Sequence, residues 1–491
     1  MVQNQGNTHS WYFREQPMKS LPFCILILSL GLSGCTWLAP EYHRPAFAMP
    51  DRWPSSEAAQ REKETATQQW WQSYQDPTLI KLINEALDGN SDVAVASARL
   101  MQTKAQYDYA TANRLPLVGL LGLHTRSQID FGENPLFSNT PGNNGFTGGL
   151  LTYEIDLWGK QASAQQAASA LYRGQSYYRD AVRLSVSAAT AQLYFNILAL
   201  ENSLRVMQEL VDTEEEMHQL AAQQFEAGAT PEISLRIAEA QLAARTAELP
   251  KISDQLERAE GALATLLGRS PQQILAATQG RGKNLDSLPI PPITPGDLPS
   301  DLLLRRPDLA ALEQMLIASN FNVGYARAAY FPTISLVGLL GVTSLDIDNI
   351  YKGSVRTWAL GGSIVGPLAD FGRTGSGVDL ALAKNQEQLA RYKAGVQTAF
   401  KEVRDALSSQ RNLQIFETEL HKKEGATTAA LNLISQRFSL GFANYGEILS
   451  MRRSCQEARL AMVTAKLYRL NGSVDLFKAL GGGWRMPDEK R

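Results

Sequence analysis

Hydrophobic and polar positions alternate in some parts of this chain and follow a helical pattern in others. In residues 151–157, and more loosely in 333–343, apolar side chains alternate with Thr, Ser or acidic ones, as in strands with two different faces. Residues 160–230 and 368–486 contain no proline and are rich in Ala, Gln and Leu, which favour helix. Each stretch can hold a helix of about 65 residues, roughly 100 Å long. Such helices must pack against others along their length.

The chain contains two copies of one pattern. The segment that begins at Pro332 matches the one that begins at Pro116, so the residue numbers differ by 216. Phe371-Gly372-Arg373 matches Trp158-Gly159-Lys160, and here the numbers differ by 213. The offset changes once, in a stretch rich in Gly, Asn and Pro, where exposed loops tolerate insertions. We therefore predict two structural repeats, each with the order helix, strand, strand, helix, helix.

The matching segments set the expected boundaries. Residues 76–268 form the first predicted repeat and 300–483 the second, joined by a proline-rich linker over 269–299 and followed by a tail over 484–491. In the first repeat we expect strands at about 117–128 and 147–157 and long helices at about 159–227 and 231–267. In the second we expect strands at about 333–344 and 357–367 and long helices at about 372–440 and 445–480.

Each pair of long helices is predicted to be a hairpin with a tight turn. Gly228 and Gly441 suit the end of a helix, where a left-handed residue is common. Thr230 is expected to cap the returning helix of the first hairpin. In the second hairpin, Asn444 and Glu447 have the spacing of a capping box.

The N-terminal region has the features of a secretion signal. The apolar run from Leu21 to Leu32 is too short to span a bilayer, and Arg14 and Lys19 precede it. We expect residues 1–34 to be removed and Cys35 to become the first residue of an irregular strap over 35–75. The alternative is a signal peptide in which the cysteine has no role. Cys455 would be the other thiol of the mature chain, so an internal disulfide is not expected if Cys35 carries lipid.

Charge and composition argue against several classes of function. The chain has 47 basic and 49 acidic residues and a net charge of -2, so no strong field attracts nucleic acid. The five histidines are scattered without metal-ligand spacing, and no metal site is expected. The glycine-rich segment 372–377 lacks the lysine and spacing of a phosphate loop. No catalytic constellation is recognisable, and we predict that the protein is not an enzyme.

The number of predicted strands bears on assembly. Strands of a soluble sandwich would alternate in the same way as those of a membrane barrel. Four strands cannot close a barrel, and open sheet edges are not tolerated in lipid. If the strands cross a membrane, two chains would supply eight strands and three would supply twelve.

The sequence resembles the TolC-like outer membrane factor family, in its lipoprotein branch. The segments that carry the resemblance span nearly the whole mature chain: residues 32–35 (LSGC, similar to a lipobox), 40–45 (PEYHRP), 70–71 (WW), 153–160 (YEIDLWGK), 304–308 (LRRPD), 328–332 (AAYFP) and 480–484 (LGGGW). The resemblance implies a mainly α fold with a membrane β-barrel, a channel-tunnel. In such a homotrimer, twelve strands form the barrel and the long helices form an α-helical periplasmic barrel.

The resemblance also implies a function and partners. Members of this family are the outer-membrane channels of tripartite efflux systems, passive exit ducts for drugs or other toxic solutes. Their partners are a periplasmic adaptor protein and an inner-membrane pump, usually of the resistance-nodulation-division type. By resemblance, Cys35 would carry a covalent lipid in the outer membrane, and no other cofactor is implied. The alternative is a lipid-anchored periplasmic scaffold or adhesin without a channel.

Site residues follow by resemblance from the two helical turns. The adaptor is expected to contact these turns, at Gly228, Ala229, Thr230, Gly441, Phe442 and Ala443. Relatives close the periplasmic aperture with carboxylates, but Ala443 and Ser450 stand at the corresponding positions here. Tyr445 and Glu447 are the remaining candidates for the constriction, and Glu447 could instead serve only as part of the helix cap.

Overall fold

The structure is a computed structural model, and it describes residues 38–48, 69–127, 142–276, 282–292, 302–344 and 355–487. The predicted signal peptide and Cys35 lie outside the described residues. Residues 49–68 of the predicted strap lie outside them as well. The chain divides into two compact units. The first comprises residues 1–42, 108–167 and 319–383, and the second comprises 43–107, 168–318 and 384–491.

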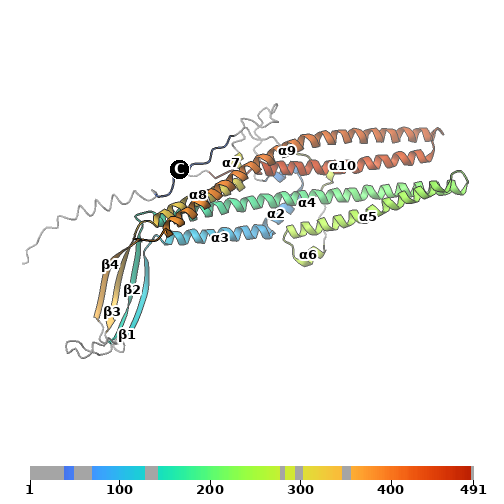
Figure 1. The fold of residues 1–491 in the computed structure, drawn as a ribbon. Coiled ribbons are helices and arrows are strands. Elements are labelled where there is room, and N and C mark those ends of the chain that lie inside the picture. Colours follow the sequence, from blue (N-terminus) through green and yellow to red (C-terminus); the bar gives the residue numbers. More distant parts are fainter. Residues whose placement is uncertain are drawn as a thin grey trace, which may run out of the picture. The chain divides into compact units, whose positions relative to one another are not determined.

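The first unit contains one antiparallel sheet of four strands in sequential order (Figure 1). The strands are β1 (Leu117–Ser127), β2 (Gly142–Ile155), β3 (Thr333–Ser344) and β4 (Val355–Val365). Strand β2 begins five residues before the predicted start, because the Gly and Asn residues that suggested a loop pair with the end of β1. The predicted ends at residues 157 and 367 are both two residues too late. Asp156, the first residue after β2, instead accepts hydrogen bonds from the backbone N–H groups of Gln161 and Ala162 in the following helix.

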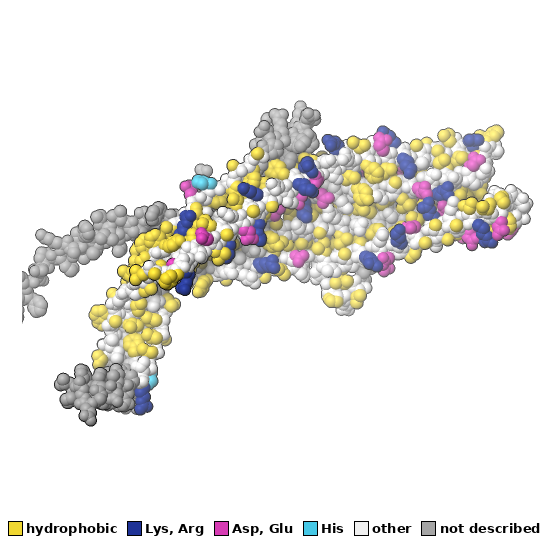
Figure 2. Space-filling view, viewed as in Figure 1, with side chains coloured by type: hydrophobic (Ala, Val, Ile, Leu, Met, Phe, Trp, Pro, Cys, Tyr) yellow, Lys and Arg dark blue, Asp and Glu magenta, His cyan; other side chains and the backbone are white. Residues whose placement is uncertain are grey.

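One face of the sheet is apolar and exposed. The strand register places on this face the exposed side chains of Val118, Leu120, Leu151, Leu336, Leu340, Trp358, Leu360 and Ile364. Hydrophobic side chains are visible over much of the strands in Figure 2. The opposite face is less polar than the alternation predicted, because Leu121, Leu150 and Leu339 accompany Thr152, Glu154, Ser335 and Ser363.

Two pairs of long helices follow the strands. They are α4 (Lys160–Glu226) with α5 (Glu232–Leu266), and α9 (Arg373–Ser439) with α10 (Tyr445–Ala479). Every boundary of the second pair follows from the first pair by the offset of 213 found in the sequence. Helices α4 and α9 each have 67 residues. None of the helices in the described ranges has the length and hydropathy needed for a membrane span.

The helix that begins each repeat is interrupted once. The first copy contains α2 (Pro77–Gly89) and α3 (Ser91–Ala112), and the second contains the short α7 (Leu302–Arg305) and α8 (Pro307–Ala328). The interruptions fall at Asn90 and Arg306, which are equivalent positions by the offset of 216. The Asn90 side chain accepts hydrogen bonds from the N–H groups of Asp92 and Val93, which caps α3. A single shorter helix was expected in each copy, and the structure has two.

The core of the second unit is aromatic. Trp70 and Tyr74 lie in the short 3-10 helix η2 (Trp70–Tyr74) and are fully buried against Phe195 of α4 and Phe477 of α10. The ring of Trp70 stacks on that of Phe477, with centroids 5.3 Å apart. The Tyr74 hydroxyl is hydrogen-bonded to Ser473 Oγ at 2.6 Å. The end of the predicted strap is therefore part of the core.

The linker between the repeats also contributes to this core. It contains α6 (Pro271–Ala276) and the 3-10 helix η3 (Leu285–Ser287), and residues 288–292 are not helical. Leu285 and Leu288 are buried in the aromatic core. The Lys283 N–H donates to Asp76, which also accepts a hydrogen bond from the Tyr194 hydroxyl.

Arg306 joins three helices of the second unit. Its buried guanidinium binds both carboxylate oxygens of Asp308, Glu402 of α9 at 2.6 Å and the carbonyl oxygen of Ala479 at the end of α10. Arginine suits such a position because its planar guanidinium carries five donors in a fixed geometry. This assigns the Arg305–Asp308 motif a structural role.

We predict that Arg306→Leu lowers stability by about 2 to 4 kcal/mol, because several charge-assisted hydrogen bonds at a buried site are lost together. The check is the midpoint of thermal unfolding by circular dichroism. Arg404→Leu is the control, since Arg404 pairs with Asp405 at the surface and such pairs contribute about 0 to 1 kcal/mol. Equal midpoints for the two variants would contradict the prediction.

Candidate functional site at the helical turns

Each long hairpin turns on a glycine in the left-handed region. Gly228 has a φ of 71° and Gly441 a φ of 77°. In the first turn the Ala229 N–H donates to the carbonyl oxygen of Gln224, and in the second the Phe442 N–H donates to that of Arg437. These bonds close a Schellman motif, in which glycine is favoured because it has no Cβ. Both turn glycines were predicted correctly.

The two turns differ in how the returning helix begins. Asn444 caps α10, because its side chain accepts a bond from the Glu447 N–H at 3.0 Å and donates to the Glu447 carboxylate at 2.8 Å. This is a variant of the predicted capping box, since the Glu447 carboxylate accepts from the side-chain amide of Asn444 and not from its backbone N–H. In the first turn the cap position is Pro231, which makes no side-chain cap, so the prediction that Thr230 caps α5 was wrong. Pro231 is the equivalent of Asn444 in the first repeat, and the repeat offset alone would have located the cap.

The turns expose apolar side chains to solvent. We define the tip surface as Phe225, Ile233, Phe438, Leu440 and Phe442, all exposed. The second turn contributes the most prominent of these, because Phe442 is 71% exposed whereas the first turn carries Ala229 at the corresponding place. Exposed apolar residues grouped in this way are typical of sites of protein interaction.

Tyr445, a predicted aperture residue, connects the second hairpin to the first. Its hydroxyl donates a hydrogen bond to Glu216 of α4, and Arg452 of α10 binds the other oxygen of the same carboxylate at 2.9 Å. The bond to Glu216 raises the pKa of Tyr445 above its usual value. The hydroxyl is the donor and the carboxylate the acceptor in this contact between hairpins. The carboxylate of Glu447, the other aperture candidate, is hydrogen-bonded to Asn444 within its own turn.

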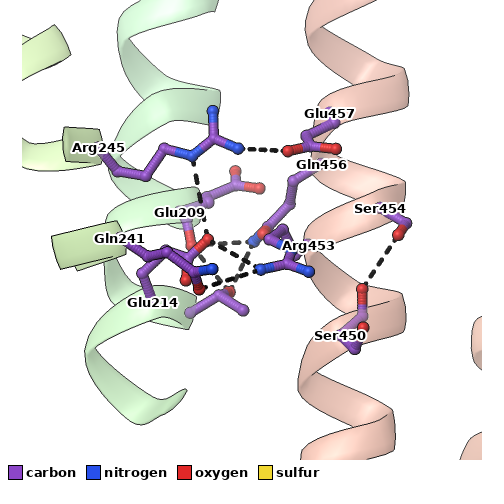
Figure 3. Close-up of polar contacts among 10 residues, drawn as sticks. Glu209, Glu214, Gln241, Arg245, Ser450, Arg453, Ser454, Gln456 and Glu457 are labelled. Atoms are coloured by element: carbon purple, nitrogen blue, oxygen red, sulfur yellow. Dashed lines mark hydrogen bonds and ion pairs between the residues drawn. The ribbon is translucent and has the colours of Figure 1, made fainter. Parts of the chain in front are cut away.

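A buried carboxylate, that of Glu214, lies two residues before Glu216 along α4 (Figure 3). Glu214 of α4 is 1% exposed and lies between Arg245 of α5 and Arg453 of α10, with N to O distances of 3.9 and 3.7 Å. Arg245 also pairs with Glu457 of α10. Two arginines from different hairpins thus share one carboxylate. The ion pairs are longer than direct hydrogen bonds, and Glu214 Oε2 has no hydrogen-bond partner among the described residues.

Further polar contacts continue along α4 and α10. The Gln456 amide donates to the Glu209 carbonyl oxygen at 2.9 Å and to Thr213 Oγ1 at 3.0 Å. Arg459 pairs with the Glu209 carboxylate at 3.3 Å. We call these contacts the polar seam, comprising Glu209, Thr213, Glu214 and Glu216 of α4, Arg245 of α5, and Tyr445, Arg452, Arg453, Gln456, Glu457 and Arg459 of α10.

Tyr445 was an aperture candidate from the sequence, whereas the charged members of the polar seam were not predicted. A difference between the two repeats could have located them. Residues 214–216 of the first copy are all Glu, whereas their equivalents at 427–429 are Thr, Thr and Ala. Arg452 and Arg453 of the second copy correspond to Glu239 and Ala240 in the first. The first repeat thus carries the acidic residues of these ion pairs and the second repeat carries the arginines.

The described residues contain no cluster of three or more His, Cys, Asp or Glu side chains suited to a metal ion. The predicted positions Ala443 and Ser450 lie near the polar seam, and the Ser450 carbonyl oxygen accepts a bond from the Ser454 hydroxyl. The ion pairs and hydrogen bonds of the seam connect α4 with α5 and α10. Such an arrangement can hold two hairpins together and can release them when its ion pairs break.

A four-stranded sheet with an exposed apolar face, combined with two long helical hairpins in each chain, fits the class of outer-membrane channel proteins. A sequence model of the outer membrane efflux protein family matches residues 82–269 and 298–482. Outer membrane protein OprJ of Pseudomonas aeruginosa is 31% identical over 465 residues, covering 94% of this chain and 95% of OprJ. SilC of Salmonella typhimurium, named a probable outer membrane lipoprotein, is 28% identical over 474 residues, covering 94% and 99%.

Similarity to solved structures agrees with these matches. The outer membrane channel CmeC of Campylobacter jejuni has a TM-score of 0.81 and 26% sequence identity, covering 92% of this chain and 96% of CmeC. The chain belongs to the outer membrane efflux protein family. It has the TolC-like fold that the sequence predicted, and it is an outer-membrane channel component of an efflux system.

Proposed function

We propose that three copies of this chain form one passive exit duct for drugs or other toxic solutes. The single observation that carries the proposal is the four-stranded sheet, which has an apolar exposed face and, among the described residues, unpaired outer edges on β1 and β4. In lipid these edges must be paired, and three copies supply twelve strands. Family membership favours this channel over the scaffold or adhesin considered from sequence. We also propose that the protein is no enzyme and that solutes pass through it unchanged.

The proposal has a direct test. Purified trimers in planar bilayers should give single-channel currents, and deletion of the protein from its host should increase sensitivity to exported toxic compounds. A purified protein that is trimeric and correctly folded but never conducts would favour the scaffold.

The proposed partners are a periplasmic adaptor at the tip surface and an inner-membrane pump, of the resistance-nodulation-division type, behind it. The contact is assigned to Gly228, Ala229 and Thr230 of the first turn and Gly441, Phe442 and Ala443 of the second. Support comes from the exposed apolar side chains of the tip surface and from the small residues of the first turn, which permit close approach of another helical tip.

We predict that Phe442→Asp abolishes efflux while trimers still form, because it places a charge within an apolar contact. Replacing Gly228 or Gly441 with a bulky charged residue should have the same effect, but it also strains a left-handed turn. Phe416→Asp is the control, since Phe416 is an exposed residue of α9 outside the tip surface. The readouts are drug resistance and the oligomeric state in membranes. Full resistance in the Phe442 variant would contradict the proposed contact.

The polar seam is proposed to hold the periplasmic end of the channel closed. Glu216 accepts bonds from both Tyr445 and Arg452, so it ties the start of α10 to α4. Glu214 reinforces this connection through arginines of two helices. Because Glu447 is held in the capping box, we assign the aperture role to Tyr445 and not to Glu447. Movement of α10 away from α4 would have to break these contacts together.

We predict that the double variant Tyr445→Phe, Arg452→Ala raises single-channel conductance several-fold, because Glu216 loses both of its partners. The control is Tyr468→Phe, which removes a hydroxyl from an exposed residue of the same helix outside the polar seam. Conductance is measured in planar bilayers, with trimer content checked on native gels. Intact trimers with the conductance of the unmodified protein would exclude the proposed closure.

The lipid anchor is proposed to be Cys35. The first described residue of the strap contacts α8 within the first unit, because the Leu38 carbonyl oxygen accepts a bond from Arg327, six residues before β3. The strap then follows α8, where the Asn320 amide binds the Pro40 carbonyl oxygen at 2.5 Å. An added Cβ at Gly324 would lie 2.7 Å from the Cβ of Ala39. These contacts of residues 38–40 are consistent with an anchor at the N-terminal end of the strap.

We predict that Cys35→Ala removes the mass of the acyl chains from the mature protein. Conductance should persist, since the strands and not the lipid line the proposed duct. The check is mass spectrometry of the N-terminal peptide together with bilayer recordings. An unmodified peptide from the natural protein would refute lipidation at this residue.

A further inference from the structure

Within the first unit, an aromatic contact joins the two repeats near the ends of the strands. The ring of Trp158, between β2 and α4, stacks on Phe331 with centroids 4.7 Å apart. Its indole N–H donates to the carbonyl oxygen of Pro332 at 2.8 Å. We call this contact the aromatic lock. Trp158 belongs to the first repeat, whereas Phe331 and Pro332 belong to the second.

The internal repeat also provides the residues for a second aromatic lock, which a single chain does not complete. Phe371 is equivalent to Trp158, and Leu115 and Pro116 are equivalent to Phe331 and Pro332. The side chain of Phe371 is 100% exposed, so it packs on nothing in the described part of its own chain. Leu115 is 65% exposed. Each chain therefore exposes both Phe371 and Leu115, the two sides of this contact, without bringing them together.

The sheet is incomplete in the same sense, because its two outer strands each pair on one side only among the described residues. Strands β2 and β3 join the two repeats, while β1 and β4 are the outer strands of the sheet. The strand register reproduces the repeat offsets. Leu117 pairs with Thr152, and adding 216 to the first number and 213 to the second gives 333 and 365. Thr333 does pair with Val365, so the sequence offsets hold in the sheet.

The same offsets, applied to the junction between repeats, predict the junction between copies. Leu150 of β2 pairs with Leu339 of β3. The equivalent of Leu150 in the second repeat is Ser363 of β4, and the equivalent of Leu339 in the first repeat is Leu123 of β1. We propose that β4 of one copy pairs antiparallel with β1 of the next, with Ser363 opposite Leu123, and that Phe371 packs on Leu115 and Pro116 of that copy. This inference rests on the proposed trimer and specifies its interface.

Closing the sheet in this way would satisfy the backbone groups along both outer strands, which lipid cannot hydrate. It would also cover Phe371, an aromatic side chain large enough to contribute strongly to an interface. Six equivalent junctions then alternate around the trimer, three within chains and three between them. The lock between copies has no counterpart of the indole hydrogen bond, because phenylalanine has no ring N–H.

The register can be tested by cysteine cross-linking in outer membranes. The double variant Ser363→Cys, Leu123→Cys places two thiols on directly opposed positions, which lie about 4.5–5.5 Å apart between Cα atoms and are within reach of a disulfide. After mild oxidation we expect dimer and trimer bands on non-reducing gels that disappear on reduction. The control pair Ser363→Cys, Gly122→Cys is slipped by one residue, so its side chains lie on opposite faces and no bands are expected. Single-cysteine variants account for Cys35 and Cys455.

The size of the unoxidised protein separates failure of this inference from failure of the proposed trimer. Trimers that cross-link only in the slipped pair, or in neither pair, would overturn the register while leaving the trimer in place. Absence of trimers in the unmodified protein would instead overturn the proposed function.

Discussion

The hydrogen-bonding requirement of the strand backbone constrains the rest of this molecule. A strand in lipid must pair along both edges, because each unsatisfied backbone group costs several kcal/mol. One chain supplies β1 to β4 in one sheet and leaves an outer edge on β1 and another on β4. Association of copies is then part of folding in the membrane. The four-stranded sheet is better described as one third of a proposed barrel than as a domain.

The internal repeat is the means by which one sequence can meet this requirement. Because β2 pairs with β3 across the boundary between repeats, the chain already contains one example of a junction between equivalent units. The aromatic lock occurs at that same boundary, between Trp158 and the Phe331-Pro332 segment. A second junction of this kind can form between copies without any new element. In the proposed trimer the outer strands and Phe371 would contact the neighbouring chain, since a single chain offers them no partner among its described residues.

Much of this architecture could be predicted from the sequence because it depends on local patterns. The positions of Gly228 and Gly441, the Asn444–Glu447 capping box and the lengths of the long helices follow from turn chemistry and the distribution of proline. Strand β2 begins earlier than predicted because backbone pairing places few demands on side chains and can include Gly and Asn. The residue type of Thr230 suits a helix cap, but the helix begins after Pro231.

Contacts between distant helices were beyond reach of such patterns. Glu214 and Arg453 belong to different repeats, and their meeting depends on how α4 lies against α10. Glu214 is buried while its neighbour Glu215 is exposed, although both read as surface positions of a charged helix. Periodicity alone does not distinguish them. Hydrophobic periodicity therefore does not predict the residues through which one helix contacts another.

The two copies are most informative where they differ. Equivalent positions that remain alike, such as the turn glycines and the strand register, serve the architecture that both repeats share. The acidic residues of α4 and the arginines of α10 have no equivalents in the other copy, and the contacts between them join the first hairpin to the second. If the copies were identical in this region, each hairpin would present the same charges and the polar seam could not form. The difference between the two copies thus provides a charge-complementary contact between helices whose turns share the left-handed glycine, and this contact is where we place control of the aperture.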